Sequence, residues 1–318
     1  QTAAFAAGGV VPPGYTNTNA SEVYDGTNWT ASPGTIGTAS RQGAASGTST
    51  AGLIFGGGTS PSALITTTQT FDGSTWTSVN SMNTARRGLA GSGTQTAAIG
   101  FGGATPSPGR TALGGTGITT AAIAMGGGAP LNVQTEEYNS SSWTSSNNIN
   151  TGRAIYGGAF GPQGAAGAAS GEPTSSPAGT AYEEYDGSSW TNGPTLNIGR
   201  NGGISLGTQT AALCVAGFTG PAAPNSYIKT SESWNGSSWT SLPSPGSDTQ
   251  TAGQGSGAGT TTAGLIFGRY DGAPNYTNKT DEYDGSSWTV GGVMITARYS
   301  VAGSGAQTAA MASSGYNT

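Results

Sequence analysis

The stretch Tyr185-Asp-Gly-Ser-Ser-Trp-Thr191 decides the fold, because the chain contains six versions of it. Each version places an aromatic residue, a short polar turn, a Trp and a Thr in the same order. The six Trp residues are Trp29, Trp76, Trp143, Trp190, Trp239 and Trp288. Successive Trp residues are 47, 67, 47, 49 and 49 positions apart. A period of about 40–50 residues is typical of β-propellers and solenoids.

An arginine and an acidic residue repeat with the same period. The arginine stands ten residues after the Trp in four copies, as Arg86, Arg153, Arg200 and Arg298. The first copy has Arg41 at twelve residues, and the fifth has Thr249 at ten. Two residues before the first aromatic there is an acid in five copies and Gln69 in the second. Since a buried guanidinium and a buried carboxylate satisfy one another, we expect one such pair in each unit.

Each unit predicts four short strands, which we name a to d in chain order. Strand a follows the arginine, and strand b is a short apolar run bounded by glycine, such as 51–58. Strand c leads to the first aromatic and strand d begins at the Trp. The Asp-Gly or Asn-Gly between them is a strong hairpin signal, because glycine accepts the positive φ of a tight turn. Only the third copy lacks the glycine, having Ser140 there.

The unit resembles the kelch repeat, the blade of a class of β-propellers. The resemblance rests on Gly102-Gly103, Gly126–Gly128, Glu183 with Tyr185, Asp186 and Trp190, and Arg200, and it covers nearly the whole chain. The tyrosine-to-tryptophan hairpin is about two residues tighter than in the usual kelch unit, and glycine pairs are broken at 215–218 and 266–269. Units of this kind are similar to arrays in structural and adhesion proteins of tailed, particularly marine, phages.

The 67-residue step contains an extra a–b strand pair. Residues 86–103 and 109–128 read as two such pairs, and the c–d hairpin between them is replaced by 104–108. We therefore predict an all-β, kelch-like β-propeller with six four-stranded blades and an incomplete seventh, formed by an inserted a–b pair near 104–128. A long inserted hairpin in a six-bladed ring is the alternative.

The two ends of the chain carry the same strand. Residues 1–9 and 307–315 both read as strand b, and the first lacks a strand a before it. Ring closure would pair the N-terminal segment with the C-terminal strand a. Alternatively, the sequence is an excerpt of a longer protein, which we favour because natural chains rarely start inside a strand. Either way, we expect residues 1–318 to form a single β-propeller domain.

The composition argues against several classes of function. The chain has no histidine, which removes the usual general base and most zinc and copper sites. A net charge of −5 with dispersed arginines argues against nucleic-acid binding. No apolar run approaches membrane-spanning length. The single cysteine, Cys214, reads as a small buried hydrophobe.

The acidic residues do not suggest catalysis. Glu136 and Glu137 are sequence neighbours, as are Glu183 and Glu184, and neighbouring residues of a strand face opposite sides. Asp72, Asp186 and Asp284 each offer only one carboxylate per turn to a calcium ion. We therefore expect no catalytic residues, no metal site, no cofactor and no enzymatic activity.

The b–c loops are long and differ in every repeat, whereas the a–b and c–d turns are short and uniform. Variable loops on a rigid scaffold are where recognition residues lie. We expect ligand contacts from five loop aromatics, Tyr15, Phe160, Tyr227, Tyr270 and Tyr276, unless they only pack their own loops. The sequence favours a non-enzymatic structural or adhesive module on a virion or cell surface, with other surface proteins or host glycans as partners. A carbohydrate-binding propeller is the alternative, and a propeller glycoside hydrolase ranks third.

Overall fold

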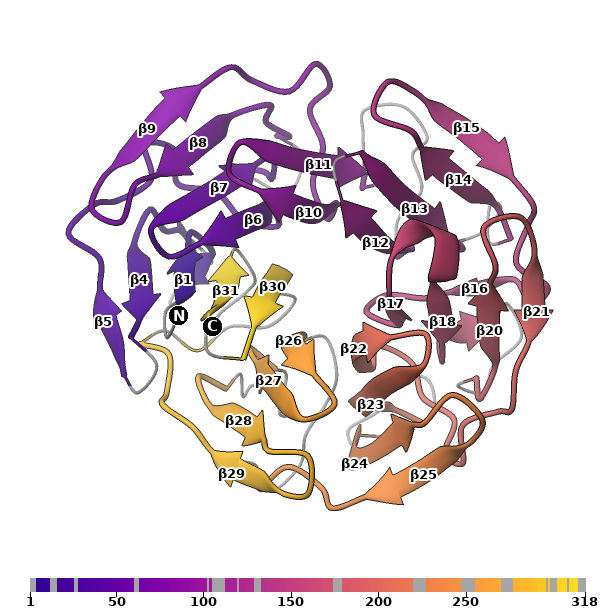
Figure 1. The fold of residues 1–318 in the computed structure, drawn as a ribbon. Helices are drawn as coiled ribbons and strands as arrows, with labels where there is room; N and C mark the ends of the chain where they lie inside the picture. Colours follow the sequence, from indigo (N-terminus) through magenta and orange to yellow (C-terminus); the bar gives the residue numbers. More distant parts are fainter. Residues whose placement is uncertain are drawn as a thin grey trace.

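The chain folds into a ring of small antiparallel sheets around a central axis (Figure 1). The computed structural model describes residues 4–11, 16–25, 28–59, 63–101, 103–104, 112–118, 120–128, 133–173, 179–219, 227–246, 255–269, 277–295, 297, 302–307 and 309–313. Within them, the one helical segment is a 3-10 turn at Gln163–Ala165. The expected all-β propeller is confirmed.

Five blades are four-stranded meanders whose strands a to d follow one another in sequence and in space. The first is β6(Ala44–Thr48), β7(Ala51–Phe55), β8(Thr68–Phe71) and β9(Trp76–Val79), and the second is β12(Gly114–Ile118), β13(Ala121–Met125), β14(Thr135–Tyr138) and β15(Trp143–Ser146). The third is β17(Ala159–Phe160), β18(Gly167–Ala169), β20(Tyr182–Tyr185) and β21(Trp190–Asn192). The fourth is β22(Ile204–Thr208), β23(Ala211–Phe218), β24(Tyr227–Trp234) and β25(Trp239–Leu242), and the fifth is β26(Ser256–Thr260), β27(Ala263–Phe267), β28(Thr280–Tyr283) and β29(Trp288–Val290).

The sixth blade closes the ring from both ends of the described chain. Its outer part is a three-stranded sheet of β1(Ala4–Ala7), β4(Ser21–Tyr24) and β5(Trp29–Ala31). The C-terminal hairpin, β30(Ala302–Ala306) and β31(Ala309–Ser313), lies between β1 and the centre of the ring (Figure 1). We predicted that the C-terminal strand a, which is β30, would pair with the N-terminal segment. Instead β30 pairs with β31, and β1 pairs with β4. The reason is local: a two-residue turn brings β31 to β30 at little entropic cost.

An additional two-stranded sheet, β10(Ala90–Thr94) and β11(Ala97–Phe101), lies between the first and second four-stranded blades (Figure 1). The extra pair is thus the earlier of the two, and not the one near 104–128 as predicted. Strand β13 pairs with β14, so the pair at 114–125 completes its own meander, and among the described residues no outer hairpin pairs with β10–β11. The innermost strands follow the order β6, β10, β12, β17, β22, β26 and β30, and β30 returns to β6.

Neighbouring blades are joined by a repeated glutamine. Gln209, in the turn between β22 and β23, donates from Nε2 to the carbonyl oxygens of Ala166 (3.2 Å) and Tyr185 (2.8 Å) in the preceding blade. Gln95, Gln163 and Gln307 make the same two bonds to the blades before them. Both β10–β11 and β30–β31 are therefore docked as ordinary inner hairpins of the ring.

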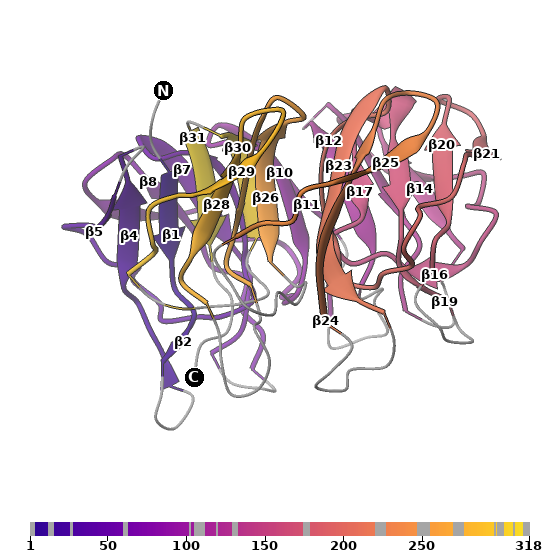
Figure 2. The ribbon, with the colours of Figure 1, turned by 90° about the horizontal axis from the view of Figure 1, so that it is seen from below.

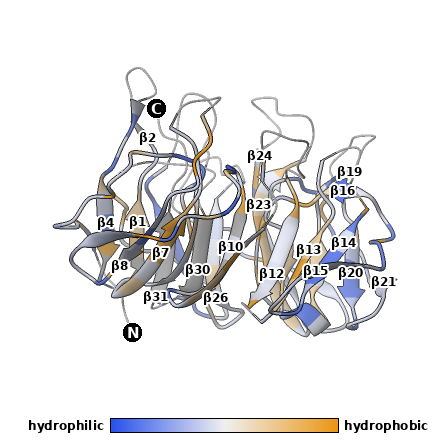
Figure 3. Cartoon of the chain, turned by 90° about the horizontal axis from the view of Figure 1, so that it is seen from above, coloured by the Kyte–Doolittle hydropathy of each residue, from blue (hydrophilic) through white to orange (hydrophobic). Residues whose placement is uncertain are grey.

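The core lies between blades rather than within one blade. Ile123 and Met125 of β13 are fully buried and pack with Tyr185 and Trp190 of the next blade. In Figure 3 the hydrophobic colour gathers on inner strands such as β7 and β13, and the hydrophilic colour on β20 and β21. Burying such aromatic side chains is worth a few kcal/mol each, about 3–5 kcal/mol by truncation to Ala. Each Trp of the repeat is thus a wedge between two blades.

Candidate functional site

One face of the ring is built from nearly identical turns. Asp186 accepts at Oδ1 from the backbone N–H groups of Ser188 (2.8 Å) and Ser189 (2.7 Å), and Gly187 takes a φ of 92°. Asp72, Asn139, Asn235 and Asp284 accept the same pair of backbone bonds in their turns. These hydrogen bonds lower the pKa of Asp186 to about 2. The side-chain oxygens are occupied by the turn itself, so this face offers little that differs between blades.

The a–b turns lie on the same face. Gly236 of one c–d turn lies against Thr210 in the a–b turn of its own blade, and Gly285 lies likewise against Thr262. Ser140, which replaces the glycine in the third copy, is forced to a φ of 73°. A left-handed conformation costs a residue other than glycine about 1–2 kcal/mol.

The opposite face carries connections that differ from blade to blade. One holds a small hairpin of β2(Val10–Val11) and β3(Thr16–Asn17), and another holds β16(Arg153–Ala154) paired with β19(Glu172–Pro173). In a third, β23 and β24 continue past an irregularity at Ala216, where φ is 58°. Figure 2 shows β2, β16, β19 and the start of β24 at the same rim of the ring. Among the described residues, the b–c face therefore differs between blades more than the opposite face, where the 3-10 turn at Gln163–Ala165 is the departure from the repeated turns.

The loop aromatics predicted as ligand contacts do not all lie there. Phe160 is in β17, is 3% exposed and stacks on Tyr182 with ring centroids 6.1 Å apart, so the prediction that it is an exposed loop residue is wrong. The chain after 160 first forms the a–b turn and β18, which moves the b–c connection of this blade downstream. Tyr227 begins β24, is half-buried and packs on Phe218 at 5.1 Å. Tyr15, Tyr270 and Tyr276 lie outside the described residues.

Two of the expected arginine–carboxylate pairs are present, and each holds the connection between two blades against the blade that follows it. Arg153 Nη1 lies 2.5 Å from Glu183 Oε1, and both side chains are fully buried. The same carboxylate accepts from the backbone N–H of Asn150 (2.6 Å) and Thr151 (3.1 Å). Arg200 pairs likewise with Glu232 of the following blade at 2.5 Å. Because every oxygen of the carboxylate has a donor, the pair is held as an internal clamp and not presented to a ligand.

The fifth copy forms the same pair with an arginine from another place. Thr249 stands where the repeat arginine would be, and Asp281 is the acid of the next blade. Arg269, directly after β27, lies 2.7 Å from Asp281 Oδ2, with both side chains fully buried. We missed this residue in the sequence, although it had a signal: Arg269 breaks the glycine pair that ends strand b. In this unit the arginine stands at a different sequence position, and the buried arginine–carboxylate pair is still formed.

The same contact closes the ring. Ile295, seven residues after Trp288, donates its backbone N–H to Glu22 Oε2 in β4 of the sixth blade at 2.7 Å. Asn150 and Asn197, which also stand seven residues after a Trp, donate the same backbone bond to Glu183 and Glu232, respectively. Arg298 lies outside the described residues. The two ends of the array therefore meet through the ordinary contact between blades.

The remaining polar groups are arranged as packing partners. Glu183 is buried in its clamp, whereas Glu184 accepts a hydrogen bond from Tyr182 Oη at 2.9 Å on the other side of the strand. Glu137 accepts from Tyr185 Oη, and burial raises the pKa of that tyrosine to about 12. Cys214 is fully buried, which raises the pKa of its thiol. Glu137, Glu183 and Glu184 are thus each hydrogen-bonded to a tyrosine or an arginine, and these contacts do not pair one carboxylate with another.

Two kinds of feature are absent from the described part of the chain. Within these residues no group of three or more Cys, Asp or Glu side chains is arranged to hold a metal ion. Nor does any helix in this part reach the length and apolar character needed to cross a membrane.

Comparison with known proteins shows the fold and no family. No protein-family model matches the chain, and no curated protein sequence matches it. Among solved structures, the structure of YjhT superposes with a TM-score of 0.55 and 14% sequence identity. The match covers 91% of this chain and 97% of that chain. At this identity the likeness shows the β-propeller fold alone.

Proposed function

We propose that this β-propeller is a non-enzymatic structural or adhesive module that attaches to a partner through its b–c face. The observation that carries the proposal is the contrast between the two faces. One face repeats the same c–d turn in blade after blade, whereas the three b–c connections described on the other face differ from one another. A rigid ring with one variable face is a scaffold for recognition, because loops tolerate change that the clamped strands do not.

The kelch-like units and their similarity to phage arrays support a place on a virion or cell surface, with another surface protein as the partner. The charge pattern supports this choice as well. Arg153, Arg200 and Arg269 are each buried against a carboxylate. These three arginines therefore do not form an exposed cationic stripe that could bind a phosphate backbone.

A carbohydrate-binding propeller is the second candidate. It is favoured by Tyr227, a half-buried ring beside Phe218 at the b–c end of β24, since aromatic faces of this kind bind sugars. Host glycans would then be the ligand.

The deciding experiment compares the two. Purified protein is screened on a glycan array and, separately, for co-sedimentation with particles or cells of the source. Heat-stable particle binding with no glycan preference supports the structural module. Saturable glycan binding that Tyr227→Ala or Tyr276→Ala removes, while Thr240→Ala on the exposed outer strand retains it, supports the lectin. Binding to neither surface contradicts the proposal.

A further inference from the structure

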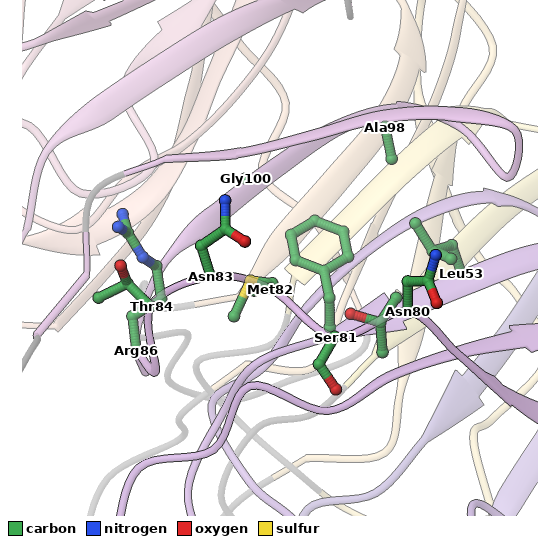
Figure 4. A pocket seen from close by; sticks show the side chains of 11 residues that line it. Leu53, Asn80, Ser81, Met82, Asn83, Thr84, Arg86, Ala98 and Gly100 are labelled. Carbon is green, nitrogen blue, oxygen red and sulfur yellow. The ribbon is translucent and has the colours of Figure 1, made fainter.

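The two-stranded sheet β10–β11 leaves a cavity where the other blades have an outer hairpin. The cavity has a volume of about 430 Å³ and lies between β7 and β8 on one side and β11 on the other, with the segment 80–86 along its edge (Figure 4). Sites that bind ligands usually measure about 300–1,000 Å³. The neighbouring complete blades show what fills the equivalent space.

The apolar wall of the cavity matches a wall that is covered elsewhere. Leu53, Phe55 and Met82 occupy the positions that Ile123, Met125 and Ile149 hold two blade positions later. There, Tyr185 and Trp190 of the following outer hairpin complete the cluster. The cluster around Leu53 and Phe55 contains Ala44, Leu89, Met82 and Ala98, with no aromatic pair from a hairpin among its described members.

A hydroxyl group is placed to accept a Trp indole. Trp190 Nε1 donates to Thr135 Oγ1 at 3.0 Å, and Trp76 Nε1 donates to Ser21 Oγ at 3.1 Å. Each acceptor is the first residue of a strand c in the preceding blade. Thr68 has this position in β8 and lines the cavity.

The segment Asn83-Thr84-Ala85-Arg86 repeats the carboxylate clamp. It differs from Asn150-Thr151-Gly152-Arg153 only in Ala for Gly, and that segment holds Glu183 by two backbone N–H groups and the guanidinium. The side chain of Asn150 also donates to the carbonyl oxygen of Trp190 at 3.0 Å. Asn83, Thr84 and Arg86 line the cavity, so the same donors border it.

The backbone of β11 is also placed for a partner. Among the described residues β11 pairs only with β10, whereas β13 pairs with β14 on the corresponding side. An edge of this kind is a template for an added strand. The six outer hairpins of the chain pair within their own blades, and the sequence contains no seventh. The added strand would therefore come from outside residues 1–318.

We propose that the cavity beside β11 binds a β-hairpin of another polypeptide, with an acid two residues before an aromatic residue and a Trp after a tight turn. Its first strand pairs with β11, its acid enters the Asn83–Arg86 segment, and its two aromatic rings fill the space against Leu53 and Phe55. The Trp indole donates to Thr68. This proposal does not depend on recognition through the b–c face.

The test uses the full chain and a peptide of residues 180–193, which contains β20 and β21, closed by a disulfide between cysteines added at its ends. Fluorescence anisotropy of the labelled peptide should show saturable 1:1 binding. Glu183→Gln or Trp190→Ala in the peptide should each weaken binding at least about tenfold, the factor given by loss of about 1.4 kcal/mol. In the protein, Arg86→Gln should weaken it similarly, and the matched control Arg87→Gln should not.

A second variant, Thr68→Val, tests the proposal independently if Arg86→Gln fails to fold. Thr68→Val preserves shape and removes the indole acceptor, so it should weaken the peptide but leave the circular dichroism spectrum unchanged. The proposal is overturned if no saturable binding occurs, or if Arg86→Gln and Arg87→Gln bind alike. Concentration-dependent dimers that the peptide dissociates would overturn the assignment to a different polypeptide, because the occupant would then be a second copy.

Discussion

Replacing Arg269 by Gly should destabilise the protein by about 3–5 kcal/mol, the usual cost of removing one partner from a buried ion pair. Arg269 and Asp281 lie 2.7 Å apart and both side chains are fully buried, so the change leaves a carboxylate without its cation and away from water. Glycine is the natural replacement, because other copies of the repeat have Gly at this place. Equilibrium unfolding in urea, followed by Trp fluorescence, measures the loss.

The second half of the experiment moves the arginine back to its place in the repeat. Thr249 is ten residues after Trp239, the spacing that positions Arg153 and Arg200. Thr249→Arg in the Arg269→Gly background should therefore recover most of the lost free energy of unfolding. Lys229→Ala, which removes an exposed positive charge, serves as the control and should change stability by no more than about 0.5 kcal/mol. A loss below about 1 kcal/mol for Arg269→Gly, or no recovery in the double variant, would refute the relocation.

Three further predictions concern single positions. Ser140→Gly should stabilise the protein by about 1 kcal/mol in urea unfolding, because it relieves a φ of 73°; a neutral or destabilising result would contradict this. Asp186, whose pKa is lowered to about 2 by its turn, stabilises the fold above the ordinary carboxyl pKa of 3.8 and loses that contribution as pH falls through 2. Asp186→Asn keeps the acceptor and should reduce the loss of melting temperature between pH 4 and pH 2, the window in which the carboxyl group of Asp186 takes up its proton; an unchanged acid profile would count against it. Cys214 should not react with a thiol reagent in the folded protein, since burial raises the pKa of its thiol; rapid labelling without unfolding would disprove the packing described.

The candidate sites could be predicted only where the repeat is regular. The pairing of Arg153 and Arg200 with an acid follows from spacing, because each unit repeats an arginine before strand a and an acid in strand c at the same positions. Phe160 was wrongly assigned to a b–c loop. Its blade has a 3-10 turn between β17 and β18, and the local sequence does not indicate which of the two apolar segments becomes strand b. Arg269 was missed because it follows strand b of its blade and does not stand ten residues after a Trp, the spacing that marks the other arginines.

By itself, the sequence determined the blade. A Tyr or Phe, an Asp-Gly turn and a Trp specify a hairpin locally, and the period of the Trp residues specifies how often it returns, since turn geometry and side-chain alternation depend on neighbours in the chain. Only the tertiary structure decided which strand pairs lack a hairpin, which arginine reaches Asp281 and where the cavity beside β11 opens. The first and third of these outcomes depend on contacts between blades, where residues far apart in sequence compete for the same space. The second depends on which arginine side chain is buried beside the acid.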